Sequence, residues 1–258
     1  MTGVILAAGR GSRLNGTAGD KPKCLVRLGG LTLLERQIRS LRRAGVDDIA
    51  VVVGCQAERV RQSTGPGVRY VENCRFAETN SLYSLWTARA LLSRGFVVLN
   101  CDVLFHPVLL DELLATHHDA ALLIDYRTPG APPYGDEEMK VKVRDGLVVD
   151  MSKTLAPEEA DGENLGIVKF GPGSAPALVA VLDRIVAGGG LRDWAPRAFR
   201  EFAEHHPLHA LSAGGRPWIE IDFPEDYQRA VRTVLPAIAG TDQLETAAHA
   251  GERAEDVA

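Results

Sequence analysis

Short runs of apolar, β-branched residues alternate with helical patterns along the first 125 residues of the chain. The apolar runs cover residues 4–6, 49–53, 68–71 and 96–99, and the helical patterns cover residues 31–44 and 80–92. In the first helical pattern Leu34, Ile38 and Leu41 fall on one face. Strands separated by helices of this length form βαβ units around a parallel sheet. The alternation therefore predicts an α/β fold.

The pattern changes after about residue 125. A Pro/Gly/acidic stretch at 128–138 predicts a loop, and period-2 alternation at 139–151 around Asp145-Gly146 predicts a β-hairpin. A strand at 166–170, helices at 175–186 and 194–204, and a last strand at 218–222 follow. We expect one domain over residues 1–238, with a mostly parallel sheet, helices on both faces and an antiparallel hairpin insertion. The small, acidic and polar residues 239–258 predict a disordered tail.

Composition limits the possible partners. The formal net charge is -5, which argues against a protein that grips nucleic acid through its phosphates. No window reaches the ~18 apolar residues that a membrane span needs. The opening apolar run is too short for a signal peptide. The four cysteines form no C-x-x-C pair, so reduced thiols in a cytoplasmic protein are expected.

A glycine-rich segment, LAAGRGSRLNGTAGDKPKCL, directly follows the first predicted strand. Its glycines allow the backbone to approach a ligand closely and to point N–H groups at phosphate oxygens. It is not the dinucleotide-binding G-x-G-x-x-G, because Leu14 stands where the third glycine is required, and it has no Walker Gly-Lys-Ser/Thr. The alternative is a turn that only connects strand to helix. The nearby Arg13 and Lys23 favour phosphate binding.

LAAGRGSRL followed by KPKCLV resembles the signature of the nucleotidyltransferases that activate sugar phosphates and related phospho-alcohols. Within that superfamily, NSLYSLW, LNCDV, SKTL, GENLGI and WIEIDFPEDY resemble the phosphocholine cytidylyltransferase branch. The resemblance covers nearly all of residues 3–235. It implies a Rossmann-like nucleotidyltransferase domain, with residues 1–125 as the nucleotide-binding half and 126–238 as the acceptor-binding half.

The resemblance also implies Mg²⁺ as the cofactor, since nucleotidyl transfer mainly requires charge neutralisation and alignment. Mg²⁺ prefers oxygen ligands, usually one or two carboxylates. Asp102 follows the predicted strand at 96–99, and Glu220 and Asp222 lie two residues apart on the last strand, where side chains share a side. We expect these three as metal ligands. Helix capping is the alternative for Asp222.

Residue roles follow from the same resemblance. Arg13, Lys23 and Asp102 would be catalytic, and Lys23 would bridge the α-phosphate and the attacking phosphate. Asn80 and Ser84 would contact the base; the alternatives are helix capping for Asn80 and a buried hydroxyl for Ser84. The nucleotide would be held by Leu6, Ala7, Ala8, Gly9, Gly11, Ser12, Arg13, Lys23, Asn80 and Ser84, and the acceptor by Lys153, Glu163 and Trp194.

A site specific for choline should contain several aromatic rings. Aromatic residues make up only 6% of this chain, and Trp194 alone falls near a position where the choline enzymes carry them. The sequence therefore predicts transfer of CMP from CTP to a small phosphorylated alcohol, polyol or phosphonate. The alternatives are a sugar- or cyclitol-1-phosphate nucleotidyltransferase that uses another NTP such as GTP, and a non-catalytic nucleotide-sensing domain.

Overall fold

A computed structural model describes residues 1–14, 21–128 and 130–239. Apart from Ala239, the tail expected from residue 239 onward lies outside these residues. Within the described residues, no helix is long and apolar enough to cross a membrane.

Nine strands of the described chain form one sheet, in the order β5-β4-β1-β6-β11-β8-β12-β10-β9. Two smaller sheets pair β2 with β3 and β7 with β13. The strands are β1 Thr2–Ala7, β2 Arg27–Leu28, β3 Leu31–Thr32, β4 Ile49–Val53, β5 Val68–Glu72, β6 Phe96–Asn100, β7 Val103–Phe105, β8 Ala120–Tyr126, β9 Lys140–Arg144, β10 Leu147–Ser152, β11 Gly162–Phe170, β12 His209–Ser212 and β13 Trp218–Glu220.

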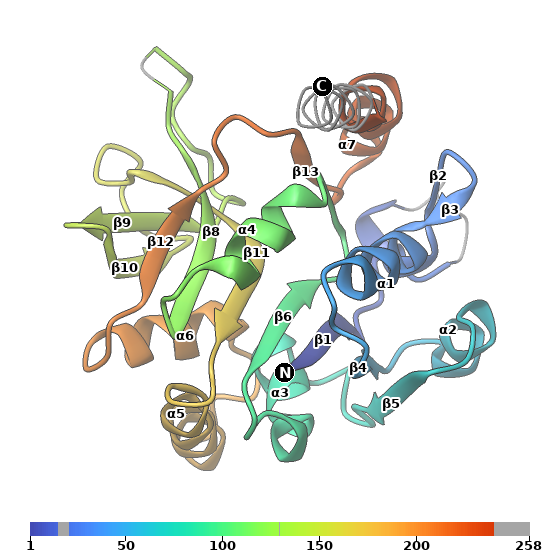
Figure 1. Cartoon of the computed structure of the whole chain (residues 1–258), viewed down its shortest axis with the longest axis horizontal. Coiled ribbons are helices and arrows are strands. Elements are labelled where there is room, and N and C mark those ends of the chain that lie inside the picture. Colours follow the sequence, from blue (N-terminus) through green and yellow to red (C-terminus); the bar gives the residue numbers. More distant parts are fainter. Residues whose placement is uncertain (15–20, 129, 240–258) are drawn as a thin grey trace, which may run out of the picture.

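The expected α/β class is confirmed, and the parallel character of the sheet is confined to part of it. β5, β4, β1 and β6 are parallel, as is the pair of β8 and β12. β11 runs antiparallel to β6, β8 and β9. The main sheet is therefore mixed: β10 and β11 run opposite to the other seven strands, which share one direction, as expected of a mostly parallel sheet with an antiparallel insertion. In Figure 1, β1, β4 and β5 lie to the right of β6, and β8, β9, β10 and β12 lie to its left.

The expected hairpin is present as β9 and β10. Asp145 and Gly146 at its tip have φ angles of 52° and 76°. A two-residue turn of this kind needs positive φ at both central positions, which Asp-Gly adopts at low cost. The last strand, expected at 218–222, ends at Glu220 and lies outside the main sheet, where it pairs with β7.

Helices cover both faces of the main sheet, as expected. The helices are α1 Leu33–Arg43, α2 Ala57–Ser63, α3 Ser81–Thr87, α4 Val108–Ala115, α5 Ala175–Ala187, α6 Ala195–Ala203 and α7 Pro224–Arg229. Val4 and Leu6 of β1 belong to the apolar cluster under α3, α5 and α6, whereas Ile5 and Ala7 belong to the cluster under α1, α2 and α4. In Figure 1, α4 lies in front of β8 and β11. A strand buried on both faces explains why residues 2–7 are continuously buried.

Candidate active site

A cavity of about 290 Å³ lies at the carboxyl ends of β1 and β6, between the first and second halves of the chain. Open α/β sheets place ligand sites at this end of their strands. Most of the residues expected from the sequence line it, namely Leu6, Ala8, Gly9, Gly11, Arg13, Lys23, Asn80, Ser84, Asp102, Lys153, Trp194, Glu220 and Asp222. The structure therefore brings together residues that are more than 200 positions apart in the sequence.

Three expected residues are not among those that line the cavity. Ala7 lies in the apolar cluster on the opposite face of β1, because successive residues of a strand point to opposite faces. The side chain of Ser12 lies outside the described part of the chain. Glu163 on β11 is half-buried, and it faces Glu138 and Asp125. Burial, together with these two carboxylates, raises the pKa of Glu163 to about 7.

The glycine-rich segment brings Lys23 close to the turn after β1. Gly11 has a φ of +63°, and a Cβ atom at this position would lie 2.6 Å from Cγ of Lys23. Only glycine fits this backbone conformation beside the lysine without displacement. Lys23 opens a short 3₁₀ helix whose next two residues, Cys24 and Leu25, are buried in the core. Both the lysine and the turn therefore have fixed positions at the rim of the cavity.

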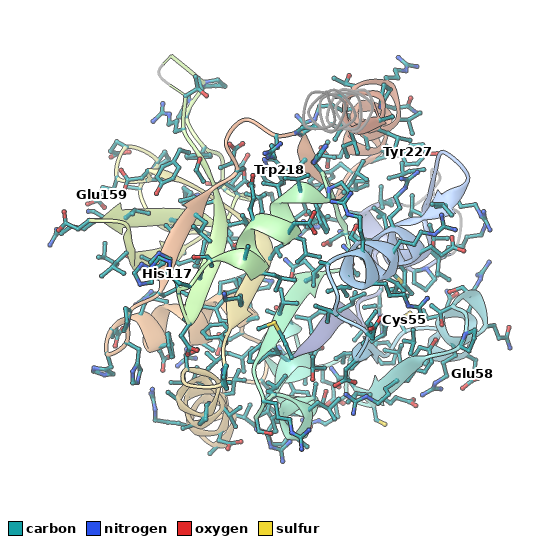
Figure 2. All side chains as sticks on the ribbon, viewed as in Figure 1. Cys55, Glu58, His117, Glu159, Trp218 and Tyr227 are labelled. Atoms are coloured by element: carbon teal, nitrogen blue, oxygen red, sulfur yellow. The ribbon has the colours of Figure 1, made fainter. Side chains whose placement is uncertain are left out.

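The pairing of β7 with β13 gathers three carboxylates. Glu220 lies opposite Val103, the residue that follows Asp102. The backbone N–H of Ile221 then donates to the carbonyl oxygen of Asp102 at 2.9 Å. Asp102, Glu220 and Asp222 each offer an oxygen within 4.8 Å of the others. Trp218, labelled in Figure 2, begins β13 and donates from Nε1 to Asp125 at 3.0 Å, which anchors the strand.

Asp102, Glu220 and Asp222 are called the acidic group below. Two cations compensate part of its negative charge. Lys23 Nζ lies 3.3 Å from Asp102 Oδ2 and also donates to Asp222. Arg13 Nη1 lies 3.3 Å from Asp222 Oδ2. Burial disfavours the charged form of Lys23, but Asp102 and Asp222 nevertheless raise its pKa above the usual value.

Asp102 and Glu220 hold their protons more tightly than carboxylic acids in water do. Burial is the largest cause that raises the pKa of Asp102. Burial also raises the pKa of Glu220 to about 8, and the charges of Asp102 and Asp222 add to the effect. A divalent cation would relieve this repulsion, and three carboxylate oxygens suit a hard cation such as Mg²⁺. The acidic group thus has the chemistry of a divalent-metal site.

The opposite wall of the cavity comes from the start of α3. Asn80 caps this helix, since its Oδ1 accepts from the backbone N–H of Ser81 at 2.8 Å. The capping role and a place in the cavity are therefore compatible for Asn80. Ser84 is 5% exposed and also lines the cavity. The backbone N–H of Asn80 donates to Leu191 at 3.0 Å, which ties this wall to the segment before α6.

Trp194 and Lys153 meet at the far side of the cavity. The Lys153 ammonium lies 5.2 Å from the centre of the Trp194 ring, and this ring is 47% exposed. Glu137 from the predicted loop lies 3.0 Å from both Arg13 Nη1 and Lys153 Nζ. The carboxylate of Glu137 therefore bridges Arg13 of the glycine-rich segment and Lys153, which follows β10.

Sequence reasoning did not single out several residues that line the cavity. Asn100 and Asn164 lie inside the quoted segments LNCDV and GENLGI, so the motifs held a signal for them. Glu137 lies in an acidic loop whose local sequence gives no indication of which carboxylate turns inward.

The chain is similar in sequence to several known proteins. The chain is 34% identical to a bifunctional IPC transferase and DIPP synthase of Rubrobacter xylanophilus over 93% of its own length, and spans 53% of that protein. It is 29% identical to the choline-phosphate cytidylyltransferase of Streptococcus pneumoniae, over 89% of this chain and 96% of the relative. The chain thus spans about half of the first relative and nearly all of the second.

Solved structures share the fold. The inositol-1-phosphate CTP transferase from T. maritima superposes with a TM-score of 0.77 at 22% identity, over 92% of this chain and 95% of that one. Residues 3–147 match the model of the MobA-like NTP transferase domain. This match covers more than half of the chain, from β1 through the first strand of the hairpin. The chain belongs to the family of MobA-like NTP transferase domains.

Proposed function

We propose that this protein transfers CMP from CTP to a small phosphorylated alcohol, polyol or phosphonate, with Mg²⁺ as cofactor and pyrophosphate as the second product. The observation that carries the proposal is the contact of Lys23 with the acidic group of Asp102 and Asp222, beside the glycine-rich turn. Nucleotidyl transfer requires cations on both reacting phosphates and a site for a divalent metal at the same place.

The chain's own groups align and neutralise the reacting phosphates. The oxygen of the acceptor phosphate attacks the α-phosphorus of CTP, and the bond to the pyrophosphate oxygen breaks. Lys23 would bridge the α-phosphate and the attacking phosphate and balance their negative charge, and Arg13 would balance charge on the leaving pyrophosphate. Asp102, Glu220 and Asp222 would hold Mg²⁺, which supplies Lewis-acid stabilisation of the phosphate oxygens when it is bound.

The names of the relatives support CTP as the nucleotide. The choline-phosphate enzyme is a cytidylyltransferase, and a further relative of this chain, from Streptomyces rubellomurinus, is a CMP-5'-(3-aminopropyl)phosphonate synthase. A sugar- or cyclitol-1-phosphate enzyme that uses GTP is the alternative. A nucleotide sensor without catalysis would not require the lysine within the acidic group. In our proposal residues 1–125 bind the nucleotide and 126–238 bind the acceptor, while Glu220 and Asp222 of the second half serve the metal.

The acceptor side favours a polyol phosphate or a phosphonate over phosphocholine. Trp194 and Phe76 are the aromatic residues among the described residues that line the cavity. Phe76 lies under Arg10, at 5.8 Å from its guanidinium carbon, and Trp194 already contacts the Lys153 ammonium. Recognition of a quaternary ammonium usually requires a cage of several rings. Lys153 is suited instead to bind the phosphate or phosphonate of the acceptor.

A screen of pyrophosphate release tests the proposal. The purified chain is incubated with each of the four NTPs and with a panel of polyol phosphates, phosphonates and phosphocholine. We expect release with CTP and at least one of these acceptors, and loss of release in EDTA with recovery on addition of Mg²⁺. Release with GTP and a sugar-1-phosphate alone would support the alternative enzyme, and no release with any pair would contradict the proposal.

Substitution of Lys23 by Ala should lower kcat by about 100-fold or more, because one electrostatic stabiliser of the transition state is lost. KM for CTP should change less than kcat. The matched control is Lys142→Ala. Lys142 lies on the β-hairpin, and its ammonium forms a surface ion pair with Glu159. Steady-state kinetics measure both. A raised KM with an unchanged kcat in Lys23→Ala would limit Lys23 to docking the nucleotide.

Substitution of Trp194 by Ala should leave KM for CTP unchanged and alter KM for a polyol phosphate by less than about threefold. Phosphocholine should be a poor acceptor for the unmodified chain, because Trp194 offers a single ring to its cation. Acceptor titrations of the two proteins measure these values. Efficient use of phosphocholine, with a KM that rises more than tenfold in Trp194→Ala, would show that the ring binds a cationic head group.

A further inference from the structure

A buried asparagine lies behind the wall of the cavity that α3 forms. Asn73 follows β5, is 1% exposed and is not among the residues that line the cavity. Its Nδ2 donates to the hydroxyl of Thr79 at 3.0 Å and to the hydroxyl of Ser84 at 3.1 Å. Both hydroxyl-bearing residues do line the cavity. A buried side chain thus contacts the hydroxyls of two residues that line the cavity.

The orientation of the Asn73 amide is fixed by a backbone group. The backbone N–H of Arg75 donates to Asn73 Oδ1 at 2.9 Å. A flipped amide would place the NH₂ group against this N–H, so two donors would face each other. Asn73 therefore directs its two amide hydrogens at Thr79 and Ser84.

The hydrogens of both hydroxyls are committed away from the cavity. Ser84 Oγ donates to the carbonyl oxygen of Asn80 at 3.3 Å, and Thr79 Oγ1 donates to the carbonyl oxygen of Arg75 at 2.8 Å. A hydroxyl has one hydrogen and two lone pairs, and Asn73 uses one lone pair on each. What remains on each oxygen is one lone pair, which can only accept a hydrogen bond.

We propose that Asn73 is a positioning residue that sets the hydrogen-bonding polarity of the base pocket. Because Thr79 and Ser84 can only accept, the wall favours a base edge that carries an exocyclic amino group and disfavours one that carries a carbonyl oxygen. Cytosine and uracil differ in this respect at C4. The inference rests on the proposed function, since it assumes that the nucleotide base lies against the start of α3.

Asn73→Ser separates this role from a structural one. A serine hydroxyl at this position can still accept from the backbone N–H two residues later, as in an ST turn, but it lacks the amide donors. Equilibrium binding of CTP and of UTP is measured by calorimetry in the presence of Mg²⁺, together with kcat/KM for each. We expect the preference for CTP over UTP to fall by about 10-fold or more, because the two hydroxyls can then turn a hydrogen toward a carbonyl oxygen.

Further variants complete the test. Ser84→Ala and Thr79→Val each remove one acceptor and should lower the same preference even if Asn73→Ser does not fold. Thr87→Val is the matched control: Thr87 lies on the same helix and donates to the backbone oxygen of Ser84, but it is not among the cavity-lining residues. Its CTP preference should equal that of the unmodified chain.

Three results would overturn the inference: equal binding of CTP and UTP by the unmodified chain, an equal loss for both nucleotides in Asn73→Ser, or an unchanged preference in both Ser84→Ala and Thr79→Val. Failure of the proposed function gives a different result. In that case the unmodified chain releases no pyrophosphate with any acceptor, whereas the ratio of the two binding constants still reports on Asn73.

Discussion

Asp102, Glu220 and Asp222 are partly buried, and each offers a carboxylate oxygen within 4.8 Å of the others. The electrostatic repulsion between these carboxylates is the constraint on which the rest of the site depends. Burial of like charges costs free energy of folding unless a cation compensates them. Lys23 and Arg13 contact Asp102 and Asp222, while the pKa of Glu220 is raised to about 8. Binding of a divalent cation would offset the repulsion between the carboxylates and so compensate this free-energy cost.

The fold creates this arrangement with short elements rather than with long ones. β7 and β13 have three residues each, yet their pairing fixes Glu220 and Asp222 beside Asp102. The turn after β1 approaches Lys23 so closely that Gly11 has no room for a side chain. Glu137 meanwhile bridges Arg13 and Lys153, two cations suited to bind the phosphates of different substrates. In our proposal, phosphate oxygens of the two substrates take the place of this carboxylate.

Local patterns were enough to predict β1, β4, β5 and β6. Of these, β1, β4 and β6 are continuous apolar runs because both of their faces are covered, and Asp145-Gly146 marks the hairpin through its turn chemistry. β8 was not predicted, since the apolar run in residues 120–126 fits a buried helix as well as a strand. The antiparallel direction of β11 was not predicted either, because its pairing with β6, β8 and β9 depends on contacts that are distant in sequence.

For the site, motifs identified most of the residues that line the cavity, and the exceptions have physical causes. Ala7 was assigned to the nucleotide because it lies within the motif, but the alternation of β1 turns it to the other face. The local sequence gave no indication that Glu137 or Asn73 belongs to the site. Glu137 reaches Arg13 and Lys153 only because its loop folds back over the cavity, and Asn73 contacts the cavity-lining residues Thr79 and Ser84 rather than the cavity itself. Such residues become visible only when hydrogen bonds and ion pairs are known.

The most direct measurement is the thermal stability of the unmodified chain and of Glu220→Gln between pH 5 and pH 9, in EDTA and in Mg²⁺. The pKa of Glu220 is about 8 in the fold against an ordinary value of 4.5, so the unfolded chain binds fewer protons in this range and stability falls as pH rises. We predict that Glu220→Gln gains stability relative to the unmodified chain as pH rises in EDTA, and that Mg²⁺ removes this difference. A difference that is independent of both pH and Mg²⁺ would contradict the claim that the acidic group is held for a divalent cation.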